Sequence, residues 1–162
     1  SFVQEALDSD IEAFKVDVYD DELANNIELN DVGYLIALTG SDQVNMHALN
    51  KFSENFGEQG AYKLASSKEI TEASDSDRES FFTPHDDYIN LSEAYRENPI
   101  INEVNISNQK EYNSLLEVLS KEEKSIPLFV ENKQGIYLLP EFEKNKFAKE
   151  DITLFYLGKV VN

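Results

Sequence analysis

The sequence predicts an α/β protein in which a partial parallel sheet with helices is followed by a small α+β module. Two observations lead to this class. In the first half, short apolar runs typical of buried strands alternate with stretches whose apolar residues recur every three or four positions. After a polar segment at residues 66–80, strand patterns prevail and include a hairpin signal.

The first half contains six predicted elements. The run "YLIAL" at residues 34–38 is too short for a helix and suits a strand covered on both faces. Ser41 or Asp42 can cap the helix that follows, and Gly57 comes where a glycine often ends one. We expect a helix end at 2–9, strands at 12–19, 34–38 and 61–65, a short helix at 21–29, and a helix at 42–56 whose apolar stripe is Val44, Ala48, Leu49, Phe52 and Phe56.

The second half has a different pattern. Asp86 can cap a helix that ends before Pro99, and Ser107 can cap another that reaches Lys121. The tripeptide "KQG" separates two apolar runs and predicts a hairpin turn. We expect strands at 101–106, 126–132, 135–142 and 151–159, and inward side chains on the second helix at Tyr112, Leu115, Leu116 and Leu119.

Composition divides the chain between these halves. The segment 66–80 is rich in Ser and acidic residues and lacks aromatic residues, which is typical of a linker or an exposed loop. We therefore expect a partial Rossmann-like half at 1–70, a linker at 71–80 and an α+β module at 81–162. Brief proteolysis should cut within 66–80 first, because this segment offers almost no apolar surface to bury.

Net charge excludes several classes of partner. The formal charge of −18 argues against nucleic acid, which needs a basic face, and against docking on anionic lipid by charge. The absence of cysteine excludes disulfides and thiolate chemistry. The longest apolar runs are five residues, far short of the roughly 20 needed to span a bilayer.

The sequence gives no support for catalysis, a metal site or a cofactor. His47 lies within a predicted helix but outside its apolar stripe. His85 precedes two aspartates, Asp86 and Asp87, and a role as helix N-cap explains Asp86 more simply than a metal site does. The acidic run "DVYDDE" lacks the central glycine of a calcium loop. No G-x-G-x-x-G spacing occurs, so a phosphate-cradling loop is absent from the sequence.

Residues 30–67 carry a family resemblance. The stretch "NDVGYLIALTGSDQVNMHALNKFSENFG", followed by "AYKLASS", resembles the nucleotide-binding-like cytoplasmic region of bacterial sodium/proton antiporters of the cation/proton antiporter-1 type. That region is related to the RCK and TrkA-like domains that regulate potassium channels and uptake systems. In the second half, "FFTPHDDYINLSEA", "IPLFVENKQGIYLLP" and "DITLFYLGK" look like the C-terminal module of the family.

The resemblance implies candidate binding residues. Asp17, Thr39, Asp42 and Asn45 match positions that lie beside the ligand in nucleotide-binding relatives. An alternative is that Thr39 and Asp42 merely finish a strand and cap a helix, while Asn45 hydrogen-bonds a neighbouring loop. The first strand, glycine turn and second strand of the family are not in this chain, so we expect negligible affinity for nucleotides.

The resemblance also implies a function. We expect a non-catalytic regulatory region, on the cytoplasmic face of the cell membrane, of a monovalent cation/proton antiporter, with the membrane transport domain of the same polypeptide as its partner. The chain starts at Ser1, and we interpret it as part of a longer polypeptide. The alternatives are a region gating a potassium channel or uptake system, and a small Rossmann-like enzyme fragment.

Loss of two strands would leave an open edge on the apolar strand at 34–38. Either the strand near Phe14 pairs with it, giving a three-stranded sheet, or two copies of the chain cover the edge together. We expect the second solution, a homodimer.

Overall fold

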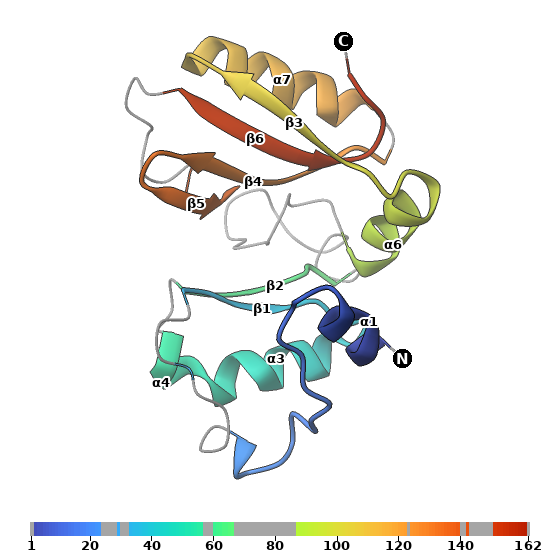
Figure 1. Cartoon of the computed structure of the whole chain (residues 1–162), viewed down its shortest axis with the longest axis vertical. Coiled ribbons are helices and arrows are strands. Elements are labelled where there is room, and N and C mark those ends of the chain that lie inside the picture. The colour runs from blue at the N-terminus through green and yellow to red at the C-terminus, as the bar shows by residue number, and fades with distance from the viewer. Residues whose placement is uncertain are drawn as a thin grey trace.

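Two sheets organise the protein (Figure 1). A two-stranded parallel sheet comes first in the chain, and a four-stranded antiparallel sheet with strand order β3-β6-β4-β5 comes second. This mixed α/β arrangement confirms the predicted class at that level. The computed structural model describes residues 2–23, 29, 33–56, 60–66, 87–122, 124–139, 142 and 151–161.

The parallel sheet consists of β1 (Leu35–Ala37) and β2 (Ala61–Lys63), paired so that Ile36 lies opposite Tyr62. Helix α3 (Asp42–Lys51) connects them and packs against both strands. Helix α1 (Phe2–Asp8) precedes this unit. The helix predicted at 2–9, the two predicted strands and their parallel pairing are therefore confirmed.

The strand predicted at 12–19 is wrong. Residues 11–17 adopt no regular secondary structure, and a turn follows at Val18 and Tyr19. The Asp17 carboxylate accepts a hydrogen bond from the Tyr19 amide (3.0 Å), and the Lys51 ammonium donates to the Val18 carbonyl (3.1 Å). These contacts hold the segment on α3, so the three-stranded alternative does not form among the described residues. The helix predicted at 21–29 lies mostly outside them.

The helix predicted at 42–56 is interrupted at Phe52. Its second part is a separate short helix, α4 (Ser53–Phe56). Phe52 takes φ −101° and ψ 10° and is buried, while the Ser53 hydroxyl donates to the Asn50 carbonyl at 2.9 Å. A serine hydroxyl bonded to a nearby carbonyl competes with the helical backbone pattern, which explains why the helix ends here. Gly57 lies outside the described residues.

The second half contains two helices and four strands. The predicted hairpin is confirmed, because Asn132 lies opposite Gly135 and leaves a two-residue turn at Lys133 and Gln134. Strand β6 is one of the two central strands and is antiparallel to both β3 and β4. The elements are α6 (Tyr88–Glu97), β3 (Ile101–Ile106), α7 (Gln109–Lys121), β4 (Ile126–Asn132), β5 (Gly135–Leu138) and β6 (Ile152–Leu157).

Both predicted N-caps in this half are off by one position. Asp87 caps α6 by accepting from the Asn90 amide at 2.9 Å; Asp86 lies outside the described residues. Asn108 caps α7 by accepting from the Glu111 amide at 3.0 Å. The Ser107 amide instead donates to the Glu111 carboxylate at 2.9 Å, so the serine supplies its backbone and not its side chain.

Two hydrophobic clusters lie on the four-stranded sheet. One packs beneath α7 and includes Tyr112 and Leu119, with Leu115 and Leu116 partly buried against it. These are the four side chains predicted to face inward. The cluster is completed by Ile106, Val130, Leu139, Phe142, Ile152, Leu154 and Tyr156.

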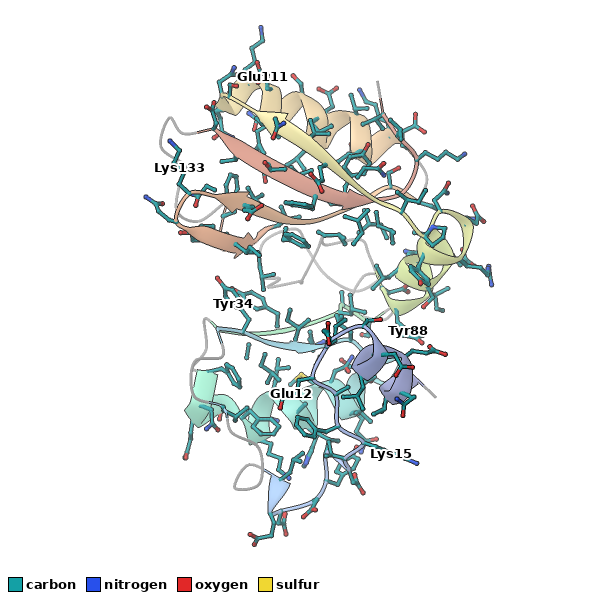
Figure 2. All side chains as sticks on the ribbon, in the orientation of Figure 1. Glu12, Lys15, Tyr34, Tyr88, Glu111 and Lys133 are labelled. Atoms are coloured by element: carbon teal, nitrogen blue, oxygen red, sulfur yellow. The ribbon has the colours of Figure 1, made fainter. Side chains whose placement is uncertain are left out.

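The other cluster joins the two halves. Tyr62 and Leu64, at β2 and just beyond it, pack with Ala94 of α6 and with four residues of the antiparallel sheet: Ile126, Leu128, Leu138 and Leu157. Tyr34, just before β1, also packs against this cluster and points toward the second half (Figure 2). The two halves therefore share a hydrophobic core. The linker and its boundaries remain predictions because residues 67–86 lie outside the described part.

No helix within the described ranges has the length and apolar character needed to cross a membrane.

Candidate functional site

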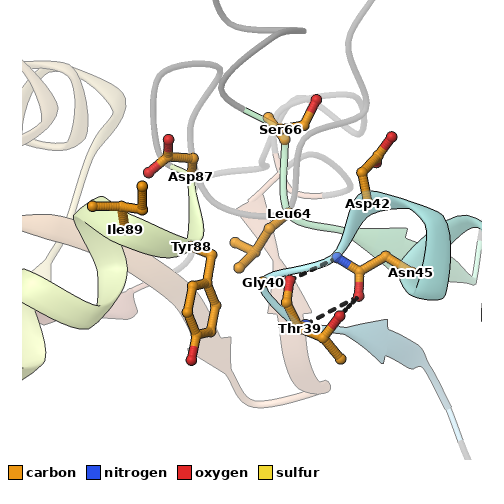
Figure 3. Close-up of a pocket in the computed structure, with 10 residues that line it drawn as sticks. Thr39, Gly40, Asp42, Asn45, Leu64, Ser66, Asp87, Tyr88 and Ile89 are labelled. Atoms are coloured by element: carbon orange, nitrogen blue, oxygen red, sulfur yellow. Dashed lines mark hydrogen bonds between the residues drawn. The ribbon is translucent and has the colours of Figure 1, made fainter.

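A pocket of about 260 Å³ lies where the two halves meet. Its walls are the turn after β1, the start of α3, the segment after β2 and the first turn of α6 (Figure 3). The first three lie at the carboxyl ends of parallel strands, where α/β proteins commonly hold ligands. The lining residues are Thr39, Gly40, Asp42, Asn45, Leu64, Ala65, Ser66, Asp87, Tyr88 and Ile89.

Asn45 closes the turn on one side of the pocket. Its Oδ1 accepts from the Thr39 amide at 3.0 Å and from the Thr39 hydroxyl at 2.7 Å, and its Nδ2 donates to the Thr39 carbonyl at 2.9 Å. The Asn45 residue is only 2% exposed. Because one amide side chain satisfies both backbone groups of Thr39, the turn is held in a single shape at the pocket wall.

The start of α3 carries a charge pair. Ser41 is the N-cap and accepts from the Val44 amide at 3.4 Å, so Asp42, the other predicted cap, does not serve as one. The Asp42 carboxylate instead accepts from the Lys63 ammonium at 2.8 Å and ties the helix to β2. The Lys63 side chain is 13% exposed and the Asp42 side chain 44%.

The opposite wall comes from α6. Asp87 is buried and occupied as the N-cap of this helix, while Tyr88 and Ile89 are substantially exposed. A Cβ atom added at Gly40 would lie 3.2 Å from Cδ1 of the Tyr88 ring. The ring of Tyr88 therefore lies almost against the turn after β1, and glycine leaves the space for it.

Three of the four predicted site residues meet in this pocket: Thr39, Asp42 and Asn45. Asp17 is not among its lining residues. It forms an exposed turn with Tyr19, whose ring lies 4.4 Å from the ring of His47 on α3. His47 thus packs against an aromatic ring.

Sequence reasoning missed the α6 wall. Asp87, Tyr88 and Ile89 reach the pocket only because α6 packs beside the parallel sheet. The one local signal was the pair of aspartates at positions 86 and 87, which marks a helix start but not a pocket.

The described residues of the pocket offer hydrogen-bonding groups and apolar walls to a ligand. Among the described residues, no group of three or more His, Cys, Asp or Glu side chains is placed to hold a metal ion. The Thr39 hydroxyl donates to the amide oxygen of Asn45, which is too weak a base to activate it as a nucleophile. What the geometry offers is a small recess with an aspartate on each of two walls, Asp42 and Asp87.

The pocket leads to a prediction about nucleotides. Since the sequence has no glycine-rich turn and two pocket residues are acidic, we expect no measurable heat when the protein is titrated with NAD(H), ATP or ADP. A dissociation constant in the micromolar range for any of the three would contradict this prediction. It would mean that the segment 39–45 binds nucleotide without the usual phosphate loop.

No family model, no curated protein and no solved structure matches this chain.

Proposed function

We propose that the chain is a cytoplasmic regulatory region of a membrane monovalent cation/proton antiporter and is not itself catalytic. The observation that carries the proposal is the pocket formed by Thr39, Asp42 and Asn45 at the carboxyl end of β1. These residues belong to "TGSDQVN", the most specific part of the resemblance to the antiporter family. Transport chemistry would belong to the membrane domain of the same polypeptide.

The position of the pocket suits a regulatory role. A ligand there would contact the turn after β1 and the first turn of α6, which belong to different halves of the chain. The halves also share the core around Leu64 and Ala94. A ligand that binds one relative arrangement of these walls more tightly than another shifts the population toward it, and an attached transport domain could respond to that shift.

The finer fold assignment is part of this proposal. The β1-α3-β2 unit, with its parallel strands, supports a partial Rossmann-like half of the RCK type. The antiparallel sheet with α6 and α7 supports a TrkA-C-like module. A potassium channel or uptake system remains the alternative transporter.

The test uses the complete gene that encodes this chain. Its product should contain membrane helices upstream of Ser1 and should exchange Na⁺ or K⁺ for H⁺ in everted membrane vesicles. Deleting residues 1–162 should preserve exchange but change its dependence on pH or cation concentration. An upstream region without membrane helices, or a deletion that leaves both dependences unchanged, would refute the proposal. Potassium flux without proton exchange would favour the channel alternative.

The homodimer is a further part of the proposal. Within the described residues β1 pairs only with β2, and Ile36 in this strand and Leu38 just after it are 38% and 40% exposed. An open apolar edge is a template for another chain. Sedimentation should therefore show a dimer that dissociates over a hundredfold dilution, and it should dissociate more readily at low salt because each chain carries −18. A monomer at all concentrations would rule it out.

A further inference from the structure

We propose that the pocket between α3 and α6 takes a small planar ligand that is uncharged or cationic and donates hydrogen bonds, and that it rejects anions. This inference deepens the proposed function. Only the regulatory role of the bound ligand rests on that function; the charge preference of the pocket does not. It concerns the chemistry of a site whose ligand the resemblance does not determine.

The charges around the pocket are the first argument. Both α3 and α6 begin there, and a helix start carries about half a positive charge, which would favour an anion. Each start already has a carboxylate, Asp42 on α3 and Asp87 on α6. The remaining cation, Lys63, is held on Asp42 at 2.8 Å. The positive groups described at the pocket are thus offset, and an incoming phosphate or carboxylate would meet two carboxylates.

Hydrogen-bonding capacity is the second argument. The Thr39 hydroxyl donates to Asn45, and the Asn45 amide nitrogen donates back to the Thr39 carbonyl. The turn therefore uses the Thr39 hydroxyl and one of the two Asn45 N–H donors internally. The carboxylates can only accept when ionised, so a ligand matches the walls best by donating.

Shape is the third argument. Leu64, Ala65 and Ile89 give the recess apolar walls, and the Tyr88 ring stands close to Gly40 (Figure 3). A flat ligand can stack on a tyrosine face, and a cation gains further attraction from the ring. The volume of about 260 Å³ falls just below the range of pockets for drug-sized ligands, so the recess fits a single ring with a few substituents.

Three probes of the same shape test the charge preference: benzamidine, which is cationic; benzamide, which is neutral; and benzoate, which is anionic. Each is titrated into the ¹⁵N-labelled protein at neutral pH and 150 mM salt, while amide shifts are followed. We expect benzamidine to shift the amides of Gly40, Asn45 and Ile89 with a Kd about tenfold below that of benzoate, and benzamide to lie between them.

Neutralising variants locate the effect. Asp87→Asn keeps a good N-cap, and Asp42→Asn removes the carboxylate that neutralises Lys63. Each should weaken benzamidine binding severalfold, and the double variant should bind benzoate at least as well as benzamidine. Asp17→Asn is the matched control, because it removes an equal charge from the same half outside the pocket lining. It should change nothing.

The outcomes separate this inference from the proposed function. The inference fails if benzoate binds as tightly as benzamidine, if no probe shifts the pocket amides, or if Asp17→Asn weakens binding as much as Asp87→Asn does. None of these results bears on the vesicle experiment, which tests transport. Conversely, failure of the deletion experiment would leave the charge preference of the pocket intact and remove only its regulatory role.

Discussion

Replacing Asn45 with alanine should lower the free energy of unfolding by about 2 kcal/mol, because it removes three hydrogen bonds that hold the turn beside the pocket. The substitution leaves the amide and carbonyl of Thr39 without their partner and opens a void at a residue that is 2% exposed. Thr39→Val should cost less, about 1 kcal/mol, because it removes the hydroxyl and keeps the backbone bonds to Asn45.

Urea denaturation followed by circular dichroism measures both losses. The control is Asn50→Ala, an exposed asparagine near the other end of α3, which should change the midpoint little. Because Asn45 lines the pocket, Asn45→Ala should also weaken benzamidine binding at temperatures where the variant remains folded. Equal stabilities of the Asn45→Ala and Asn50→Ala variants would show that the Asn45–Thr39 bonds contribute nothing.

Replacing Gly158 with alanine should cost more, about 3–5 kcal/mol, since backbone strain and steric overlap add at a buried position. Gly158 has φ +132°, which side chains rarely adopt. A Cβ there would lie 2.7 Å from both the Lys124 carbonyl oxygen and the Ser125 Oγ. Its own carbonyl accepts from Asn102 Nδ2 at 2.8 Å, so the backbone cannot move away without breaking this bond.

Gly135 separates the two contributions. It has φ +151° at the start of β5, directly after the hairpin turn, but nothing lies within 4 Å of a Cβ added there. Gly135→Ala should therefore show the strain alone, about 1–3 kcal/mol. Thermal denaturation of the two variants gives the comparison. If Gly135→Ala destabilised the protein as much as Gly158→Ala, crowding by Lys124 and Ser125 would have no role.

Lys124, which lies beside Gly158, also connects the end of α6 with the antiparallel sheet through a hydrogen bond. Lys124, whose carbonyl crowds Gly158, has φ +65° and hydrogen-bonds Glu97 at the end of α6. This hydrogen bond lowers the pKa of Glu97 below its usual value. Since the folded pKa is lowered, any stabilisation from the pair is present above the unfolded pKa of Glu97 and is lost as pH falls through the folded pKa. The Glu97 side chain is exposed to solvent, so the loss should be slight.

The sequence by itself determined the elements whose signals are local. The apolar run at 34–38 contains β1. Ser41, one of the two residues predicted as the N-cap of α3, does cap this helix. The predicted hairpin turn at Lys133 and Gln134 joins β4 to β5. These depend on residues a few positions apart, so alternation, capping and turn chemistry suffice to predict them. The resemblance likewise indicated Thr39, Asp42 and Asn45, which do meet in the pocket.

Only the tertiary structure decided what depends on distant partners. Residues 12–19 alternate like a strand, yet Lys51 and the Asp17 turn hold them on α3 without a strand partner among the described residues. The apolar pattern of the predicted helix continues through Phe52 to Phe56. In the structure Phe52 is buried as that pattern predicts, but α3 ends at Lys51 with Phe52 as its C-cap. Asp87 becomes a pocket residue because Ala94 and Leu64 pack in one core and bring α6 beside the turn after β1. Periodicity states which side of a segment is apolar, but the surface that covers it is chosen by packing between segments far apart in the chain.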